Sequence, residues 1–531
     1  MKDARPTDYG LQNSLVHVLA ENMRTQSEQS RLRLLETHIS WVLLAGRYAY
    51  KIKKAVNLGF LNFSSLEARH YYCKEEIRLN RRLAPEIYLD VITIGGSEEN
   101  PVFGELPAIE YAVRMRRFPL SRQLDKLAAK DKLLPQHIDS LAATIAKFHR
   151  DLPASDVKET YGTAESVSGD IAQNFEQLHE LLKERADLDR LAVLRRASEN
   201  EYAVCHRMLQ QRVEQGYIRE CHGDLHLGNI VLIGGQPVPF DGIEFNPALR
   251  WIDVISEIAF TVMDLLYHKR SDLAFRFLNA YLENTGDYAG IPLLRLYTAY
   301  RAMVRAKVSA IRSAQHGLPH LGASKALATC RAYLELAADC YIGKKPVLII
   351  THGLPGSGKS TFAQMALERL RAIRLRSDVE RKRLYGLGPL ADSHALGGID
   401  LYSAEVTRQA YAQLNVLARE LLLAGYTVIV DAAFVTLNER TQFRQLADEL
   451  SVPFVIAAVY ASKETLRDRI MKRQQAANDA SEADIAVMEK LMLSHDPLTP
   501  AERGHTAEFR NEGGGIVADE AGWSRLEQLL D

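Results

Sequence analysis

The feature that most constrains this chain is a glycine-rich stretch at residues 346–361, which reads Pro-Val-Leu-Ile-Ile-Thr-His-Gly-Leu-Pro-Gly-Ser-Gly-Lys-Ser-Thr. Its apolar run, Val347 to Ile350, is suited to a buried parallel strand. The residues from Gly353 to Ser360 fit the pattern G-x-x-x-x-G-K-[ST] of a phosphate-binding P-loop, or Walker A motif. A strand, this loop and then a helical pattern together predict a site for a nucleoside triphosphate.

Each residue type in the loop has a physical role. Glycines let the backbone turn tightly, so that its N–H groups can point at phosphate oxygens, and the following helix adds its positive N-terminal end. Lys359 can reach the outer phosphates, where we expect it to act in catalysis, and the Ser360 hydroxyl can ligate Mg²⁺. The residues expected to hold the ATP phosphates are Gly353, Leu354, Pro355, Gly356, Ser357, Gly358, Lys359, Ser360 and Thr361.

Length and composition limit the class of protein. At 531 residues the chain is too long for one ordinary core, so roughly two to four units are expected. A formal net charge of −1 gives no overall basic excess of the kind that a nucleic-acid coat or a membrane-surface protein needs, although a local basic patch stays possible. The N-terminus lacks an apolar signal core, and no apolar run is long enough to span a bilayer. The cysteines show no C-x-x-C spacing, so we expect a reduced, cytoplasmic protein whose cysteines form neither a metal site nor a disulfide framework.

The first part of the chain predicts a small sheet that carries one helix. Following a polar helical stretch at 11–36, strands are predicted at 38–44, 48–53, 88–94 and 109–116, and a helix at 64–83. Alternation puts Lys51 and Lys53 on one face of their strand, and Glu76 lies in the helix. A strand lysine followed by a helix glutamate is the ion pair with which protein-kinase-like enzymes hold nucleotide phosphates, but lysines on strands more often lie on solvated faces.

A second catalytic pattern lies at residues 220–229, which read Glu-Cys-His-Gly-Asp-Leu-His-Leu-Gly-Asn. Phosphoryl transfer to a hydroxyl needs a carboxylate that orients the nucleophile and accepts its proton, together with oxygen ligands for Mg²⁺. Asp224 suits the first role. Asn229 and Asp241 suit the second, because the spacing is that of an H-x-D-x-x-x-x-N catalytic loop followed by a metal-binding aspartate. The alternative is a polar loop whose side chains only cap turns.

Residues 35–340 resemble the aminoglycoside phosphotransferase and choline kinase branch of the protein-kinase-like fold, through the loop His-Gly-Asp-Leu-His-Leu-Gly-Asn and the later Phe-Asp-Gly-Ile-Glu-Phe. Three further stretches resemble a bacterial family that fuses such a domain to a P-loop ATP-binding domain. They are Glu-Thr-His-Ile-Ser-Trp at 36–41, Tyr-Lys-Ile-Lys-Lys at 50–54 and Leu-Asn-Arg-Arg-Leu-Ala-Pro at 79–85. The resemblance covers nearly the whole chain.

The resemblance implies a role for each matching residue. Asp224 would be the catalytic base, and Asn229 and Asp241 would be the Mg²⁺ ligands. The ATP phosphates would be held by Lys51 or Lys53, with Glu76 as the helix partner of that lysine.

Three further features bear on this resemblance. Residues 114–118 would lie near the hinge that receives the nucleotide base, and Asp253 would support the catalytic loop. The first hairpin has only Gly46 where protein kinases carry a G-x-G-x-x-G loop, which departs from the protein-kinase pattern. This branch acts on antibiotics, choline, sugars and amino-acid derivatives, so the resemblance does not name the acceptor.

The last part of the chain predicts an α/β domain with a parallel sheet and helices on both faces. Apolar, β-branched runs at 347–350, 427–430 and 455–460 alternate with helical stretches. Asp378, at the end of a strand opposite the P-loop, is well placed to orient an acceptor hydroxyl. Asp431 ends another strand at a Walker-B-like position, where it can hold the water shell of Mg²⁺.

A basic helix near residues 466–473 occupies the place where P-loop kinases carry a lid. Arg469 and Arg473 on this helix can stabilise charge on the transferring phosphoryl group, although a solvated helix face is the plainer interpretation. This half resembles small P-loop kinases such as gluconate kinase, polynucleotide kinase and the zeta-toxin sugar kinases. The resemblance rests on Ser-Asp-Val-Glu-Arg at 377–381 and on Asp431.

The predicted fold class is an α+β protein-kinase-like domain, with a small sheet lobe and a helical lobe, followed by an α/β P-loop NTPase domain. The predicted bounds are a helical extension at 1–34, the kinase-like domain at 35–341 and the P-loop domain at 346–531.

The leading hypothesis is a bifunctional phosphotransferase that uses ATP and Mg²⁺ and acts on hydroxyls of small-molecule acceptors. One alternative is a P-loop kinase fused to a kinase-like domain that senses a ligand without turnover. Another is nucleotide-gated binding of a protein or of a polynucleotide end, for which arginines between 440 and 473 leave room. No feature of the sequence indicates a membrane or a protein partner.

Overall fold

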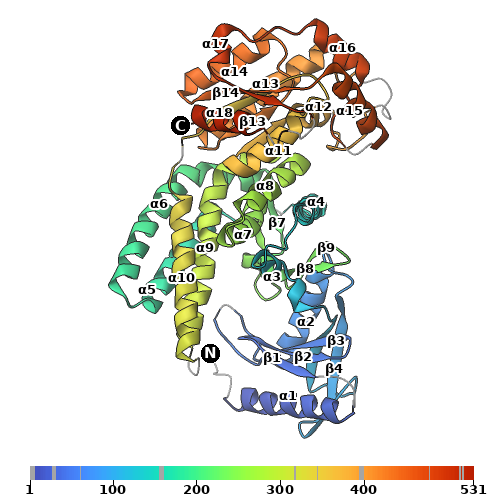
Figure 1. Ribbon diagram of the computed structural model, residues 1–531. Coiled ribbons are helices and arrows are strands. Elements are labelled where there is room, and N and C mark those ends of the chain that lie inside the picture. Colours follow the sequence, from blue (N-terminus) through green and yellow to red (C-terminus); the bar gives the residue numbers. More distant parts are fainter. Residues whose placement is uncertain are drawn as a thin grey trace. The chain divides into compact units, whose positions relative to one another are not determined.

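The computed structural model describes residues 6–26, 32–59, 61–154, 161–315, 319–343, 345–393, 400–476, 479–512, 516 and 519–530 (Figure 1). The chain forms two compact units, which we describe separately. Unit 1 comprises residues 1–181 and 202–264, and unit 2 comprises residues 182–201 and 265–531. Among the described residues, no helix combines the length and the apolar composition needed to cross a bilayer.

Unit 1 contains an antiparallel sheet with the strand order β1-β2-β3-β6-β4-β5. The helix α1 packs on one face, where Leu15 and Val16 meet Trp41 of β2. The helix α2 packs on the other face, and Ser65 caps its N-terminus by accepting a hydrogen bond from Ala68 N. The bounds are α1 (Pro6–Gln26), β1 (Arg33–Glu36), β2 (Ser40–Ala45), β3 (Tyr48–Lys53), α2 (Leu66–Asn80), β4 (Tyr88–Ser97), β5 (Asn100–Phe103) and β6 (Glu110–Arg116).

The predicted helix at 11–36 is wrong at its end. The helix α1 stops at Gln26, and residues 33–36 form β1, which pairs antiparallel with β2. The physical reason is that Leu34 packs with the sheet core, so burial and strand pairing outweigh the local helical pattern. The strand predicted at 48–53 is confirmed with the same bounds, the other predicted strands and the helix are confirmed with shifted ends, and β5 was not predicted.

The remainder of unit 1 is largely helical, with two short antiparallel strand pairs, β7 with β10 and β8 with β9. The β8–β9 hairpin turns at Gly234 and Gly235, both of which have positive φ. The bounds are η1 (Leu120–Arg122), α3 (Leu124–Ala128), α4 (Pro135–Asp151), α5 (Ala164–Leu181), α6 (Arg185–Glu214), β7 (Ile218–Glu220), η2 (Leu227–Asn229), β8 (Ile230–Ile233), β9 (Gln236–Pro239), η3 (Pro247–Leu249), β10 (Trp251–Asp253) and α7 (Val254–Tyr267). The residues of α6 and α7 are divided between the two units.

Unit 2 contains a parallel sheet with the strand order β12-β13-β11-β14-β15, as predicted for a P-loop domain. Ile349 of β11, Phe362 of α11 and Trp523 of α18 belong to one core on one face of this sheet. The bounds are β11 (Leu348–His352), α11 (Lys359–Leu370), β12 (Ile373–Arg376), α12 (Ser377–Leu384), α13 (Ala404–Leu423), β13 (Val428–Asp431), α14 (Leu437–Leu450), β14 (Phe454–Tyr460), α15 (Lys463–Ala476), α16 (Ile485–Leu493), α17 (Pro500–Arg503), β15 (Thr506–Arg510) and α18 (Glu520–Leu530).

Unit 2 also includes helices that precede the P-loop in sequence. They are α8 (Ser271–Thr285), η4 (Tyr288–Leu293), α9 (Leu294–Ser313) and α10 (His320–Cys340). Asn279 of α8 donates a hydrogen bond to Ala372 O at 2.9 Å and accepts one from Arg374 N at 2.6 Å, so α8 satisfies backbone groups beside the edge strand β12. The predicted domain bounds at 34, 341 and 346 stay a prediction.

Candidate functional site

In unit 1, the two lysines singled out from the sequence share one glutamate. Lys51 Nζ lies 2.8 Å from Glu76 Oε1, and Lys53 Nζ lies 2.7 Å from Glu76 Oε2. Lys51 also reaches Asp241 Oδ1 at 2.6 Å, whereas Lys53 is fully buried and pairs with Glu244. The geometry therefore favours Lys51 over Lys53 as the lysine that faces a nucleotide.

The charges of this cluster stabilise one another. Burial alone would lower the pKa of Lys51, but the carboxylates of Asp241 and Glu76 raise it well above its ordinary value. Burial alone would raise the pKa of Glu76, but the two lysines lower it to about 2. Burial raises the pKa of Glu244 in spite of Lys53. Lys51 and Glu76 are therefore both charged at neutral pH, as a phosphate-binding ion pair requires.

The predicted catalytic loop places its polar groups together. Asn229 Nδ2 donates to Asp224 Oδ2 at 2.8 Å, so the amide oxygen of Asn229 is the atom that could ligate a metal ion. Asp241 adopts a positive φ of 64° and donates its backbone N–H to Tyr88 Oη, so its half-exposed carboxylate is held beside Lys51. Phe118 belongs to the segment that is predicted to form the hinge. Its ring packs edge-on against the ring of Phe240, the residue before Asp241.

The helix α7 supports the catalytic loop from behind. Glu257 accepts hydrogen bonds from the backbone N–H groups of His222 and Gly223, at 2.7 and 3.0 Å. Asp264 accepts one from Leu227 N at 2.9 Å. Buried carboxylates that bind backbone amides fix a loop strongly, because leaving either group unpaired is unfavourable.

Asp253, which the sequence analysis expects to support this loop, lies elsewhere. It binds Arg212 through two hydrogen bonds, at 2.6 and 2.8 Å, and accepts another from Ile255 N at the start of α7. The expectation had the right segment but the wrong residue. Glu257, four residues further along, binds the loop instead, and the signal that could have found it is the pair of carboxylates, Glu257 and Asp264, in a largely apolar helix.

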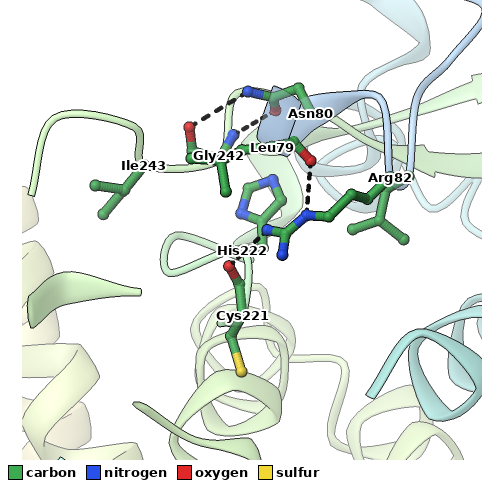
Figure 2. Close-up of a pocket in the computed structure, with 8 residues that line it drawn as sticks. Leu79, Asn80, Arg82, Cys221, His222, Gly242 and Ile243 are labelled. Carbon is green, nitrogen blue, oxygen red and sulfur yellow. Dashed lines mark hydrogen bonds between the residues drawn. The ribbon is translucent and has the colours of Figure 1, made fainter. Parts of the chain in front are cut away.

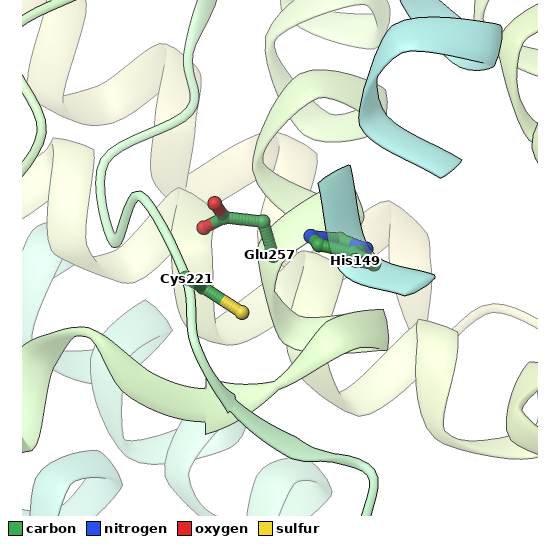
Figure 3. Close-up of side chains that lie close together, drawn as sticks. All are labelled: His149, Cys221 and Glu257. Atoms are coloured by element: carbon green, nitrogen blue, oxygen red, sulfur yellow. The ribbon is translucent and has the colours of Figure 1, made fainter. Parts of the chain in front are cut away.

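Glu257 also belongs to a buried group with His149 and Cys221 (Figure 3). Their possible ligand atoms all lie within 4.8 Å of one another. Burial lowers the pKa of His149 to about 3, so its imidazole is neutral. Because both carboxylate oxygens of Glu257 already accept backbone N–H groups, we assign this group to support of the loop.

Residues at and just after the C-terminal end of α2 form hydrogen bonds with the catalytic loop at 220–229 and with the segment that follows Asp241 (Figure 2). Asn80 Oδ1 accepts a hydrogen bond from Gly242 N at 2.7 Å, next to the predicted metal ligand Asp241. Arg82 donates to the carbonyls of Glu220 and Cys221 at the start of the catalytic loop. The cavity between these groups has a volume of about 10 Å³, enough for one water molecule.

Through Asn80, α2 also holds the backbone beside the predicted metal ligand, a role that was not predicted. Glu76 and Asn80 are four residues apart, so they lie on one face of the helix, and this spacing is the signal that could have revealed it. The same helix therefore positions the partner of Lys51 and the backbone beside the metal ligand.

In unit 2, the P-loop requires its glycines. Gly353 and Gly358 have backbone φ values of 147° and 101°, which residues other than glycine rarely adopt. A Cβ atom at Gly353 would lie 2.4 Å from Val459 O, and one at Gly358 would lie 2.0 Å from Asn511 Nδ2. The loop leads directly into α11, whose first residue is Lys359.

The phosphate and metal groups of this loop lie beside Asp431. Lys359 Nζ donates to the loop carbonyl of Leu354 at 2.9 Å, and burial lowers the pKa of Lys359 to about 8 against the effect of Asp431 and Asp378. Asp431 is buried at the end of β13, and no residue in the described part of the chain hydrogen-bonds to its Oδ2. Asp431 and Ser360 line the same cavity, and a buried carboxylate oxygen of this kind beside a hydroxyl fits a Mg²⁺ ion and its water shell.

Asp378 faces the same cavity from the first turn of α12. Tyr402 Oη donates to Asp378 Oδ1 at 3.2 Å, and Arg381 NH1 lies 3.9 Å from the same oxygen. The cavity has a volume of about 270 Å³ and is lined by Asp378, Lys359, Ser360 and Asp431 together. Tyr402 was not predicted, because no motif in the sequence marks it.

The predicted lid arginines lie over the P-loop. Arg469 donates to Gly356 O at 3.3 Å and to Asn511 O at 2.9 Å, and Arg473 donates to Ala483 O. Both arginines line the cavity. Arg440 is different, because it is buried against Glu502 and donates to backbone carbonyls, so it is not available to a ligand in this arrangement.

Comparisons with known proteins give one matching family model and relatives that are similar over most of the chain. Residues 348–498 match the family model described as an AAA domain. The Mycobacterium tuberculosis protein named "Uncharacterized protein Rv2004c" and the Mycobacterium bovis protein named "Uncharacterized protein Mb2027c" are each 31% identical to this chain over 457 residues, covering 85% of it and 88% of each relative.

Two solved structures are similar to parts of the chain. A choline/ethanolamine kinase family protein from Mesorhizobium loti is 12% identical, with a TM-score of 0.37, and the match covers 62% of this chain and 99% of that one. A gluconokinase from Sinorhizobium meliloti 1021 is 16% identical, with a TM-score of 0.26, and the match covers 35% and 97% respectively. From its identity to the mycobacterial relatives over most of both chains, the chain belongs to their family, and its residues 348–498 match an AAA domain.

Proposed function

We propose that the protein is an ATP-dependent phosphotransferase with two active sites, one in each unit. Each site would transfer the γ-phosphoryl group of ATP to a hydroxyl of a small-molecule acceptor. The observation that carries this proposal is the cavity of unit 2, in which the P-loop, Asp378 and Asp431 line one space of about 270 Å³. Phosphoryl transfer depends mainly on positioning and on neutralising charge, and these are the groups that it needs.

In unit 2, each residue of the cavity has a separate role in the proposed transfer. Lys359 and the N-terminal end of α11 bind the β- and γ-phosphates. Asp378 orients the acceptor hydroxyl and takes its proton as the new P–O bond forms. Ser360 and Asp431 would hold Mg²⁺, which when bound neutralises charge on the phosphates. Arg473 approaches the transferring group from the lid.

In unit 1, an equivalent set comes from different elements. Lys51, held by Glu76, binds the phosphates, and Asp224 orients the acceptor hydroxyl and takes its proton. Asn229 and Asp241 offer oxygen ligands that suit Mg²⁺. Because Asp224 and Asn229 are both present and hydrogen-bonded to each other, catalysis is a better interpretation of this unit than ligand sensing without turnover.

The experiment is a transfer assay with ATP that carries a labelled γ-phosphate. The acceptors are a panel of sugars, polyols, amino alcohols and oligonucleotides with a 5′-hydroxyl. We expect Asp224→Asn and Asp378→Asn to remove different sets of labelled products, each by about 100-fold or more, because a positioned base contributes that much. Labelling of oligonucleotides alone would favour the polynucleotide alternative.

Two results would contradict the proposal. One is labelling that survives both substitutions in a single chain. The other is loss of all products with either single substitution, because two independent sites cannot both depend on one carboxylate. A variant with Glu67→Gln, an exposed position at the start of α2, serves as the control for expression and handling.

A further inference from the structure

A buried carboxylate of the helix α8, that of Glu283, contacts two arginines of the strand β12 beside the P-loop site. Glu283 Oε1 accepts hydrogen bonds from Arg374 Nε at 2.9 Å and from Arg374 NH2 at 2.6 Å. Its Oε2 lies 3.5 Å from Arg376 NH1. Arg374 and Arg376 both belong to β12, so the two arginines of this edge strand are drawn toward one residue of α8.

One of these arginines, Arg376, also lies beside the predicted metal ligand Asp431. Arg376 Nε is 3.8 Å from Asp431 Oδ2, which is within ion-pair distance but too far for a hydrogen bond, and Asp479 binds another nitrogen of Arg376 at 2.9 Å. As noted above, no described residue hydrogen-bonds to this oxygen of Asp431, although it is buried. A buried carboxylate oxygen close to a guanidinium would normally pair with it.

Glu283 explains why this pairing is incomplete. The guanidinium of Arg376 lies among three carboxylates, those of Glu283, Asp479 and Asp431. With Glu283 charged, its attraction opposes a closer approach of Arg376 to Asp431 than the 3.8 Å of their ion pair. Without that charge, Arg376 keeps its hydrogen bond to Asp479, and Asp431 becomes the buried carboxylate that Arg376 can approach more closely.

We propose that Glu283 is a positioning residue of the P-loop site: together with Asp479 it keeps Arg376 from closing its 3.8 Å ion pair with Asp431 into a hydrogen bond, and so leaves that carboxylate available to Mg²⁺. This inference rests on the proposed function, because it requires Mg·ATP to bind at the P-loop. It places a determinant of metal binding in a helix that precedes the predicted P-loop domain at 346–531.

The test measures binding, not turnover. We define the magnesium advantage as the dissociation constant for ATP in the presence of a chelator divided by that in the presence of Mg²⁺. Both are measured by calorimetric titration of the full chain carrying Asp241→Ala, in which the proposed site of unit 1 is disabled. We expect Glu283→Gln to reduce the magnesium advantage about tenfold or more, as is typical when a residue that orients a metal ligand is changed.

Two further variants separate this role from a general loss of structure. Asp272→Asn removes the same charge from the same helix, where Asp272 pairs with Arg270, and it should leave the magnesium advantage unchanged. Adding Arg376→Gln to Glu283→Gln should restore most of the advantage, because the competing guanidinium is gone. A purely structural role predicts the opposite, since the second substitution removes further contacts.

The outcomes are distinct. An unchanged magnesium advantage in Glu283→Gln, or no recovery in the double variant, would overturn the inference while leaving the proposed function in place. If Glu283→Gln does not fold, Arg376→Gln alone decides: a retained advantage supports the inference and a lost one overturns it. If the Asp241→Ala chain binds no ATP at all, the proposed function of unit 2 fails, and the inference fails with it.

Discussion

Replacing Glu76 with glutamine tests the ion-pair cluster of unit 1 with almost no change in side-chain shape. Glu76 is fully buried and is the shared partner of Lys51 and Lys53. Folding lowers the pKa of this carboxyl from 4.5 to about 2, which corresponds to about 3 kcal/mol of stability at pH 7. Breaking a buried ion pair by removing one partner costs about 3 to 5 kcal/mol, which is the same magnitude as the stability that follows from the change in pKa.

The pH dependence follows from the direction of that change in pKa. A carboxyl whose pKa is lowered by folding stabilises the folded state fully above pH 4.5, and this stabilisation is lost as the pH falls toward 2. The difference in stability between the wild-type protein and Glu76→Gln should therefore be largest at neutral pH and should fall to less than half of that value near pH 3.

Hydrogen exchange followed by mass spectrometry is the suitable assay, because it reports on peptides of unit 1 and unit 2 separately. Peptides from β3 and α2 should lose protection equivalent to about 3 kcal/mol in Glu76→Gln, while peptides from β11 should not change. Glu67→Gln, in the exposed first turn of the same helix, is the matched control and should behave like the wild type. A loss below about 1 kcal/mol at pH 7, or an equal loss at pH 3, would refute the reasoning.

Three further predictions concern other residues. Lys359→Ala should abolish phosphoryl transfer by unit 2 while products that depend on Asp224 persist, and loss of both in the labelled-phosphate assay would contradict two independent sites. Gly358→Ala should weaken ATP binding to unit 2 strongly, because the added Cβ would lie 2.0 Å from Asn511 Nδ2 at a φ of 101°; unchanged affinity in calorimetry would show that the loop does not bind phosphate in this form. Burial lowers the pKa of His149 from 6.5 to about 3, so the unfolded chain takes up a proton that the folded chain does not, and stability should fall as the pH drops from 6.5 toward 3. His149→Gln should make unit 1 less sensitive to acid over that range in denaturant titrations, and equal sensitivity would contradict the burial argument.

The parts of the account that the sequence could predict are those with a local pattern. The P-loop is a continuous motif, and its strand, its glycines and Lys359 lie where the motif predicts. The alternation that put Lys51 and Lys53 on one face is confirmed by their shared bond to Glu76. Parallel strands separated by helices likewise predicted the sheet of unit 2.

The parts that the sequence could not predict depend on contacts between distant segments. The sequence pattern left Lys51 and Lys53 equivalent, and only the position of Asp241, far along the chain, favours Lys51. Residues 33–36 have a helical local pattern, but pairing with β2 makes them a strand. Glu283 lies in a helix with no motif, and its link to the P-loop site appears only when β12 is packed beside it.

The central claim, that the chain has two working sites for Mg·ATP, is tested most directly by counting those sites. Calorimetric titration with Mg·ATP should give two sites in the wild-type protein, with Lys359→Ala losing one and Asp241→Ala losing the other. A single site that disappears with Lys359→Ala and is unaffected by Asp241→Ala would contradict the claim, and it would make unit 1 a domain that binds some other ligand.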